Sequence, residues 1–333
     1  MHGRRTFLAA SVGTLASLAS AKPSSAADGS DKKLTRADID AMMKDLSNWG
    51  RWGKDDQLGA LNLVTPAKRK QAASLVKDGV SVSLAHSAIK EPVDGSPAFV
   101  HRMIAVPKQG QEIASAADEY SVRYHGFTQT HLDGLSHLIY KGKMHNGFSQ
   151  EELTPRGARK LGIENVKNGI FTRGVLMDMP RLIGVRFLDG KRAIHTEDLE
   201  AWEKKAGVRV ESGDAILLRT GRWLRRDVDG PWDIMKGSAG LHASCLPWLK
   251  QRDVAVVGSD LALDVMPSGV PDFELPVHWV CGVALGTPIL DNCDLEKVSE
   301  EANARKRWAF LLTVAPLVVE GGTGSPVNPL ATF

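Results

Sequence analysis

Gly213-Asp214-Ala215-Ile216-Leu217-Leu218-Arg219-Thr220-Gly221 is the segment that points most directly to the fold class. Its centre is a continuous apolar run between polar and glycine residues, which predicts a buried strand that enters a glycine turn. A strand that is apolar on both faces belongs to a sheet covered by helices on both sides. The segment therefore predicts an α/β protein.

Other segments repeat this pattern along the chain. Apolar runs predict buried strands at residues 174–179, 254–260 and 308–314, and alternation predicts a half-buried strand at residues 80–84. Caps and apolar spacing predict helices at residues 36–45, 65–77, 196–205 and 241–250. Because no Ser/Gly/Pro tract or charge run interrupts residues 28–333, we expect a single domain with a mixed, largely buried β-sheet flanked by helices.

The first residues predict an export signal. Gly3-Arg4-Arg5-Thr6-Phe7-Leu8 is a twin-arginine start, and a weakly apolar stretch rich in Ala, Ser and Gly follows it. That stretch is shorter than the about 20 residues of a membrane-spanning helix. We therefore interpret residues 1–27 as a twin-arginine signal peptide and expect a periplasmic or secreted protein without a membrane anchor. The alternative, a frayed N-terminal helix, leaves the paired arginines unexplained.

The charge of the chain argues against a nucleic-acid-binding protein, and the cysteine spacing argues against a zinc finger. Removal of residues 1–27, which hold three basic residues and no acid, lowers Lys plus Arg from 42 to 39, equal to the 39 acidic residues. A nucleic-acid-binding protein needs a clustered basic face, and the densest basic patch, residues 222–226, is followed by two aspartates. Cys245, Cys281 and Cys293 show no zinc-finger spacing, and an odd number cannot all pair internally.

The segment Thr128-Gln129-Thr130-His131-Leu132-Asp133-Gly134-Leu135-Ser136-His137 carries the predicted chemistry. His131 and Asp133 are two residues apart, so on an extended strand both side chains point to the same face. An imidazole nitrogen and a carboxylate oxygen on one face can share a divalent metal. His137 lies four residues beyond Asp133 and is the predicted catalytic acid or base. The alternative is a chance gathering of core or surface histidines.

A second candidate cluster lies downstream. Pro276-Val277-His278-Trp279 places a histidine among apolar residues, and Asp291 follows it by 13 residues. By itself such a histidine is more often hydrogen-bonded in a core than bound to a metal. If the fold brings His278 to His131 and Asp133, the combined set suits Zn²⁺ or Mn²⁺ with an open coordination position.

With these motifs the chain resembles the metal-dependent cyclase-like hydrolase family, which includes bacterial kynurenine formamidases and isatin hydrolase. That family carries His-x-Gly-Thr-His-x-Asp-x-Pro-x-His, and residues 127–137 match its Thr-His-x-Asp-x-x-x-His half. The resemblance covers roughly residues 48–320, and Gln-Thr-His-Leu-Asp is typical of a subgroup. It implies a swivelling β/β/α fold, a homodimer or homotetramer, His131 and Asp133 as metal ligands, and His137 as the catalytic histidine.

Three positions depart from the family pattern. Phe127 stands where the motif has its first ligand histidine, and a phenyl ring cannot bind a metal. Gln129 replaces glycine, and its amide oxygen is either a weak ligand or a plain hydrogen-bonding group. Asp291 replaces glutamate and is one methylene shorter. The expected ligands of one divalent ion, zinc or manganese, are His131, Asp133 and His278, with Asp291 and Gln129 as weaker candidates.

The predicted activity is hydrolysis of a small-molecule amide, lactam, formamide or lactone. A divalent ion lowers the pKa of bound water from 15.7 to about 7, and His137 is suited to pass a proton to the leaving nitrogen or oxygen. Trp52, Phe127, Trp279 and His145 are candidates for lining the substrate pocket, although core tryptophans look the same in sequence. The rivals are a metal-dependent lyase or dehydratase, a non-catalytic small-molecule or metal-binding protein, and core histidines without metal.

Overall fold

The strand at residues 213–221 lies in the middle of the central sheet. In the computed structural model, which describes residues 33–93 and 96–333, β9 (Ala215–Arg219) runs parallel to β7 (Ile170–Asp178) on one side and β11 (Val256–Ser259) on the other. Every residue of β9 and β11 is buried. The continuous apolar runs therefore form central strands, as the sequence predicts.

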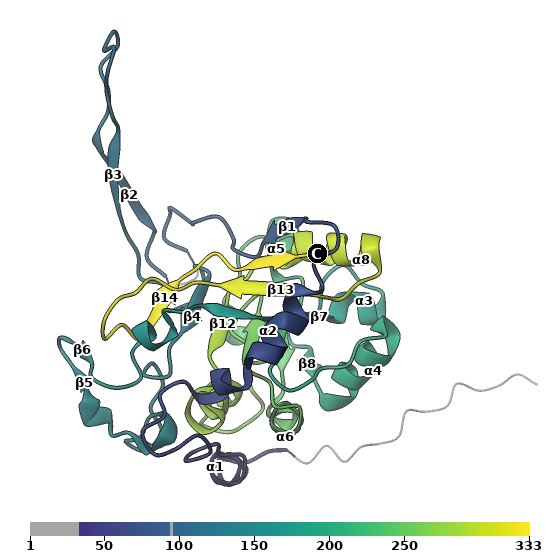
Figure 1. Ribbon diagram of the computed structural model, residues 1–333. Coiled ribbons are helices and arrows are strands. Elements are labelled where there is room, and N and C mark those ends of the chain that lie inside the picture. Colours follow the sequence, from purple (N-terminus) through teal and green to yellow (C-terminus); the bar gives the residue numbers. More distant parts are fainter. Residues whose placement is uncertain (1–32, 94–95) are drawn as a thin grey trace, which may run out of the picture. The chain divides into compact units, whose positions relative to one another are not determined.

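Nine strands make up this sheet, in the order β1-β15-β13-β7-β9-β11-β12-β4-β14 (Figure 1). β7, β9, β11 and β12 are parallel to their neighbours within this group, while the flanking pairs are antiparallel, so the sheet is mixed. The remaining strands are β1 (Ser81–Ser83), β15 (Leu330–Thr332), β13 (Ala309–Val314), β12 (Ile289–Asp291), β4 (His131–Asp133) and β14 (Gly324–Pro326).

Both faces of the sheet are covered. Along β7 and β9, Val175 and Ile216 belong to one apolar cluster and Leu176 and Leu217 to another, because successive side chains of a strand point to opposite faces. The first cluster includes residues of α4 (Thr196–Ala206) and α6 (Leu246–Gln251), and the second includes residues of α8 (Glu296–Arg305). The predicted α/β fold with a mixed, buried sheet flanked by helices is confirmed.

The other elements are short. The helices are α1 (Arg36–Asp45), α2 (Pro66–Ala73), α3 (Met179–Ile183), α5 (Arg222–Asp229) and α7 (Pro276–Trp279), and α7 continues into a π-helical segment, Val280–Leu285. Two-stranded sheets pair β2 (Val100–Ala105) with β3 (Ala117–Ser121), β5 (Leu153–Thr154) with β6 (Gly157–Ala158), and β8 (Ala193–Ile194) with β10 (Gly240–Leu241). The β2–β3 hairpin extends away from the central sheet (Figure 1).

Most predicted elements occur, and the differences have local causes. The helix at residues 36–45 is confirmed, whereas the next one ends at Ala73 and not at residue 77. His195, not Thr196, is the residue before α4, and Asp198 bonds back to its backbone. The predicted helix at residues 241–250 begins only at Leu246, because Leu241 pairs in β10 and the proline that follows suits a first helical turn.

Leu34–Phe333 forms one compact unit. The predicted signal peptide at residues 1–27 lies outside the described residues, so the boundary to the predicted domain at residues 28–333 stays a prediction. Cys245, Cys281 and Cys293 are buried free thiols. Within the described ranges, no helix has the length and apolar character needed to span a bilayer.

Candidate metal centre

The short strand β4 brings the predicted ligands together. Its three residues are all buried, and Leu132 enters the apolar cluster beneath α8 while His131 and Asp133 point to the other face. β12 runs antiparallel beside it with Asp291 opposite His131. The sheet register therefore places residues from two distant segments of the chain side by side.

Three donor atoms form a compact group at this register. His131 Nε2 lies 3.3 Å from Asp133 Oδ1 and 4.0 Å from Asp291 Oδ2. One donor atom from each of the three residues lies within 4.8 Å of the other two. The other ring nitrogen of His131, Nδ1, lies 2.8 Å from the backbone oxygen of Gln129, which orients the ring so that Nε2 faces the carboxylates.

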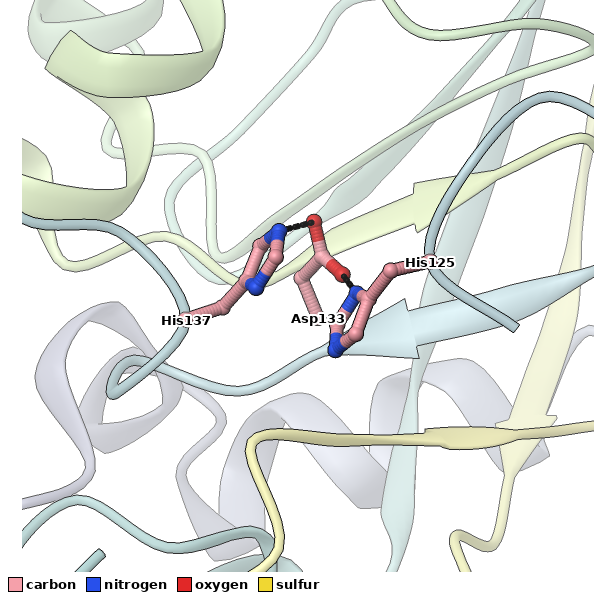
Figure 2. Close-up of side chains that lie close together, drawn as sticks. All are labelled: His125, Asp133 and His137. Carbon is pink, nitrogen blue, oxygen red and sulfur yellow. Dashed lines mark ion pairs between the residues drawn. The ribbon is translucent and has the colours of Figure 1, made fainter. Parts of the chain in front are cut away.

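His125 and His137 also contact the Asp133 carboxylate. His125 Nδ1 lies 2.9 Å from Asp133 Oδ1, and His137 Nε2 lies 4.0 Å from Asp133 Oδ2 (Figure 2). The rings of His125 and His137 stack in parallel with centroids 3.7 Å apart. Gly324, which pairs with Asp133 in β14, leaves space for this arrangement, because a Cβ there would lie 3.0 Å from His125 Cε1. His125, Asp133 and His137 thus form a second group of three donors.

The surroundings fix the ionisation of Asp133 and His137. Burial by itself would raise the pKa of Asp133, but the neighbouring histidines, His137 foremost, outweigh it and hold the pKa well below its ordinary value. Burial lowers the pKa of His137 to about 4, and the attraction of Asp133 only partly opposes this. At neutral pH the site therefore holds a carboxylate anion beside a neutral imidazole that is able to accept a proton.

His278 reaches the site through Asp291. His278 Nε2 lies 3.0 Å from Asp291 Oδ2, and its Nδ1 lies 3.1 Å from Asp264 Oδ2. Burial would lower the pKa of His278, yet Asp291 and Asp264 raise it well above the ordinary value. The structure brings the predicted ligand His278 to the centre but places its ring between two carboxylates, where it orients Asp291.

The residues fit a divalent cation. Asp291 Oδ1 is a buried atom that makes no hydrogen bond within residues 33–93 and 96–333, and Asp133 Oδ1 contacts only ring nitrogens of His125 and His131, at 2.9 and 3.3 Å. Buried polar atoms are normally paired, so Asp291 Oδ1 requires a partner of another kind. Imidazole nitrogens and carboxylate oxygens are the donors that zinc and manganese accept.

Gln129 and the predicted pocket residues take varied positions. The Gln129 side chain is buried and donates to the backbone oxygen of Ile89, while its backbone oxygen contacts His131. Phe127 lines a cavity together with His125. Trp279 donates from Nε1 to the backbone oxygen of Ile139, and its ring packs edge-on against Phe273.

Trp52 and His145 contact residues outside the metal centre. The Trp52 ring is partly buried under the Arg51 guanidinium, at 4.9 Å. His145 is fully buried, and its Nδ1 lies 3.0 Å from the backbone oxygen of Val283 in the π-helical segment. Within the described part of the chain, neither residue contacts His131, Asp133 or Asp291 through a hydrogen bond or ion pair.

A buried network holds the loop that carries His125. Asn292 donates from Nδ2 to the backbone oxygens of Gly126 and Gln129, at 2.7 and 3.1 Å. Arg222 donates to the backbone oxygen of Phe127 and, at 2.9 Å, to Asn292 Oδ1. Asn292 has a left-handed backbone with φ of 54°, a conformation that asparagine adopts more readily than most residues. Asn292, which follows Asp291, therefore positions the loop that carries His125.

Sequence reasoning missed His125 and Asp264. The pair His125-Gly126 looks like a surface turn in sequence, but the structure places His125 against Asp133. Asp264 is fully buried in an apolar segment, and such an acid needs partners. An acidic residue within an apolar run was therefore the sequence signal that could have identified Asp264. No comparable signal existed for His125, whose position depends on the network around Asn292.

Comparisons with known proteins agree with the fold. The family described as "Putative cyclase" matches residues 64–264. A crystal structure described as a novel cyclase is 30% identical and covers 87% of this chain and 99% of that chain, with a TM-score of 0.78. A search of curated proteins gave no match.

Isatin hydrolases are similar at lower identity. Isatin hydrolase A from Labrenzia aggregata, bound to benzyl benzoate, is 20% identical and covers 78% of this chain and 94% of that chain, with a TM-score of 0.53. Isatin hydrolase A from Ralstonia solanacearum is 21% identical and covers 76% of this chain and 91% of that chain, with a TM-score of 0.51. At these identities the similarity concerns the fold alone.

Proposed function

Because the chain belongs to the cyclase family, we propose that it is a metal-dependent hydrolase that cleaves the C–N or C–O bond of an amide, lactam, formamide or lactone. One observation carries the proposal. Asp133 lies among the imidazoles of His125, His131 and His137, and the neighbouring Asp291 keeps a buried oxygen, Oδ1, without a hydrogen bond in the described residues. A purely structural core would pair that oxygen.

The residues that would hold the metal are His131, Asp133 and Asp291, with His278 orienting Asp291. When bound, a divalent zinc or manganese ion supplies Lewis-acid polarisation of a carbonyl and activation of water at neutral pH. His125, Asp133 and His137 form the other possible donor group. The two groups share Asp133, so its substitution removes a donor from both.

His137 is the residue placed to move a proton. It is only partly buried, whereas His131 and Asp133 are enclosed, so His137 faces incoming substrate. Its pKa of about 4 leaves the ring neutral and ready to take the proton of water as the water oxygen bonds to the carbonyl carbon. The same proton then passes from His137 to the nitrogen or oxygen whose bond to that carbon breaks.

Two measurements test this function. Metal analysis of the purified protein should find a transition metal that Asp133→Ala lacks, and a screen of cyclic and N-formyl amides, esters and lactones should find metal-dependent turnover. In ¹⁸O-labelled water the label should enter the new carboxylate. Full turnover by metal-free protein would refute the proposal, and turnover without label would favour the lyase or dehydratase alternative.

The non-catalytic alternative rested on the loss of a ligand at Phe127. His125, two residues earlier, supplies an imidazole to Asp133, so the aromatic residue at 127 does not leave the carboxylate without a histidine. Retention of a ligand without turnover across the same panel would favour that alternative.

We also propose export and self-association. The twin arginines Arg4 and Arg5 support twin-arginine export to the periplasm or beyond, and substitution of both by lysine should retain the protein in the cytoplasmic fraction. The family resemblance supports a homodimer or homotetramer, which light scattering coupled to size-exclusion chromatography would measure.

A further inference from the structure

The metal centre has one accessible edge. The side chains of His125 and His137 are 28% and 30% exposed, whereas those of His131, Asp133 and Asp291 are 5% exposed or less. A substrate therefore approaches across the stacked pair of histidines. What lies next to that pair determines which compounds are able to bind.

A cavity of about 710 Å³ lies beside His125. Its wall includes Arg123, Phe127, Trp232 and Met235 in addition to His125. Cavities that bind small molecules have volumes of about 300–1,000 Å³ and combine apolar walls with a few polar groups. This cavity has the size and the composition of such a site.

Its aromatic walls are held in place before any ligand arrives. Trp232 donates from Nε1 to the backbone oxygen of Gly237 at 2.8 Å, and the Arg225 guanidinium lies 4.1 Å from the centre of its ring. Phe127 packs against a buried apolar cluster that includes Leu261 and Met266. Fixed aromatic surfaces favour a flat apolar ligand, because little side-chain freedom is lost on binding.

Arg123 adds a positive charge to the same cavity. Arg123 and His125 both line it, while Tyr124 between them donates from its hydroxyl to the backbone oxygen of Gly324. This is the alternation of an extended chain. Among the described residues of the wall, the carboxylate is that of Asp233, which is paired with Lys236 at 2.9 Å. Within residues 33–93 and 96–333 the Arg123 guanidinium has no hydrogen bond or ion pair, so its charge is available to a ligand.

We propose that this cavity binds the substrate, and that the substrate joins a flat apolar body, packed between Phe127 and Trp232, to an anionic group that pairs with Arg123. The reactive carbonyl of such a compound would lie toward His125 and His137. The proposal rests on the hydrolase function proposed above, of which it specifies the substrate class. An arginine recognises carboxylate, sulfonate or phosphate oxygens through two parallel N–H donors.

Binding of a matched pair of probes tests this without any turnover. 2-Naphthalenesulfonate and the neutral methyl 2-naphthyl sulfone have the same ring system, and a sulfonate is a weak metal ligand. Their dissociation constants would be measured by calorimetry on the metal-loaded full chain. The proteins compared are the native chain, Arg123→Ala, Arg123→Lys, Trp232→Leu and Arg209→Ala, the last as a control for loss of an exposed positive charge elsewhere.

We expect the sulfonate to bind the native chain at least about tenfold more tightly than the sulfone. Arg123→Ala should weaken sulfonate binding by roughly 10- to 100-fold and leave sulfone binding within about twofold, because one charge-assisted contact is lost. Arg123→Lys should keep part of the preference, Trp232→Leu should weaken both probes, and Arg209→Ala should change neither.

Equal affinity for both probes, or an equal change for both in Arg123→Ala, would overturn the proposal. Because the readout is binding, it is independent of hydrolysis. If the probes behave as expected but no carbonyl compound of the panel is cleaved, the hydrolase function fails and the binding site stands.

Discussion

Asp264→Asn tests the metal centre through Asp264, which contacts His278, the residue that orients Asp291. The Asp264 carboxylate accepts hydrogen bonds from the backbone nitrogens of Val277 and His278, at 2.7 and 3.1 Å, and contacts His278 Nδ1 at 3.1 Å. Asparagine has the same size but only one acceptor oxygen. At least one buried donor then loses its partner, which costs about 1–3 kcal/mol of folding stability.

The effect should pass from His278 to the metal. His278 is held on Asp264 at one nitrogen and meets Asp291 Oδ2 with the other, at 3.0 Å. Loss of a residue that orients a ligand in this way typically weakens metal binding by about 10- to 100-fold. That corresponds to about 1.4–2.8 kcal/mol of binding free energy.

Metal affinity would be measured by competition with a chelator, and folding stability by urea unfolding of the metal-free protein. Asp214→Asn is the matched control, since Asp214 is fully buried and paired with Lys68 at 2.7 Å and with Arg173 at 2.6 Å, and within the described residues it has no hydrogen bond or ion pair with β4. It should cost more stability, about 3–5 kcal/mol, and leave metal affinity unchanged in the folded fraction. A folded Asp264→Asn protein with native metal affinity would refute the reasoning.

Four further predictions concern single residues. His137→Ala should lower kcat/KM by about 10²- to 10⁴-fold with metal content unchanged; loss of metal in elemental analysis would instead identify His137 as a ligand. Asp133→Asn should lose metal outright, because both donor groups include this residue; stoichiometric metal in the variant would contradict both groups. Burial lowers the pKa of His145 below its value in the unfolded chain, so the unfolded state binds the proton first and stability falls as the pH drops below about 6.5, by at most about 1.4 kcal/mol per pH unit. His145→Gln should flatten this dependence in urea unfolding between pH 7 and pH 5, and an unchanged slope would show that other groups cause it. Gly240→Ala should destabilise the fold by about 1–3 kcal/mol, because its Cβ would lie 2.4 Å from the backbone of Asp264; an unchanged urea midpoint would show that the backbone moves to admit the methyl group.

The central strands could be predicted because their signal is local. β9 and β11 are apolar on both faces, and such runs have few alternatives to a buried strand. β4 and β14 have three residues each and carry polar or special residues, so their strand character depends on their neighbours. The β2–β3 hairpin is exposed along both strands and therefore lacks the alternation that would predict it.

In the candidate site, too, the features set by local sequence could be predicted, and those set by contacts between distant segments could not. The two-residue spacing of His131 and Asp133 fixes their shared face as soon as the segment is extended. Their approach to Asp291 depends on the register of β12 against β4, which pairs residues 160 positions apart. A single sequence holds no record of such a register. The same is true of His125, whose loop is set by Asn292 and Arg222 from elsewhere in the chain.

The position of Asp133 explains why these histidines belong to a site and not to a core. A buried carboxylate is costly unless charges or hydrogen bonds compensate for the lost water. Asp133 contacts His125 Nδ1 at 2.9 Å and His137 Nε2 at 4.0 Å, yet burial keeps His137 neutral near pH 7. The raised pKa values of His131 and His278 show that the carboxylates draw protons into the cluster. A divalent cation that replaces those protons would bind Asp133 and also satisfy Asp291 Oδ1, which makes no hydrogen bond in the described residues.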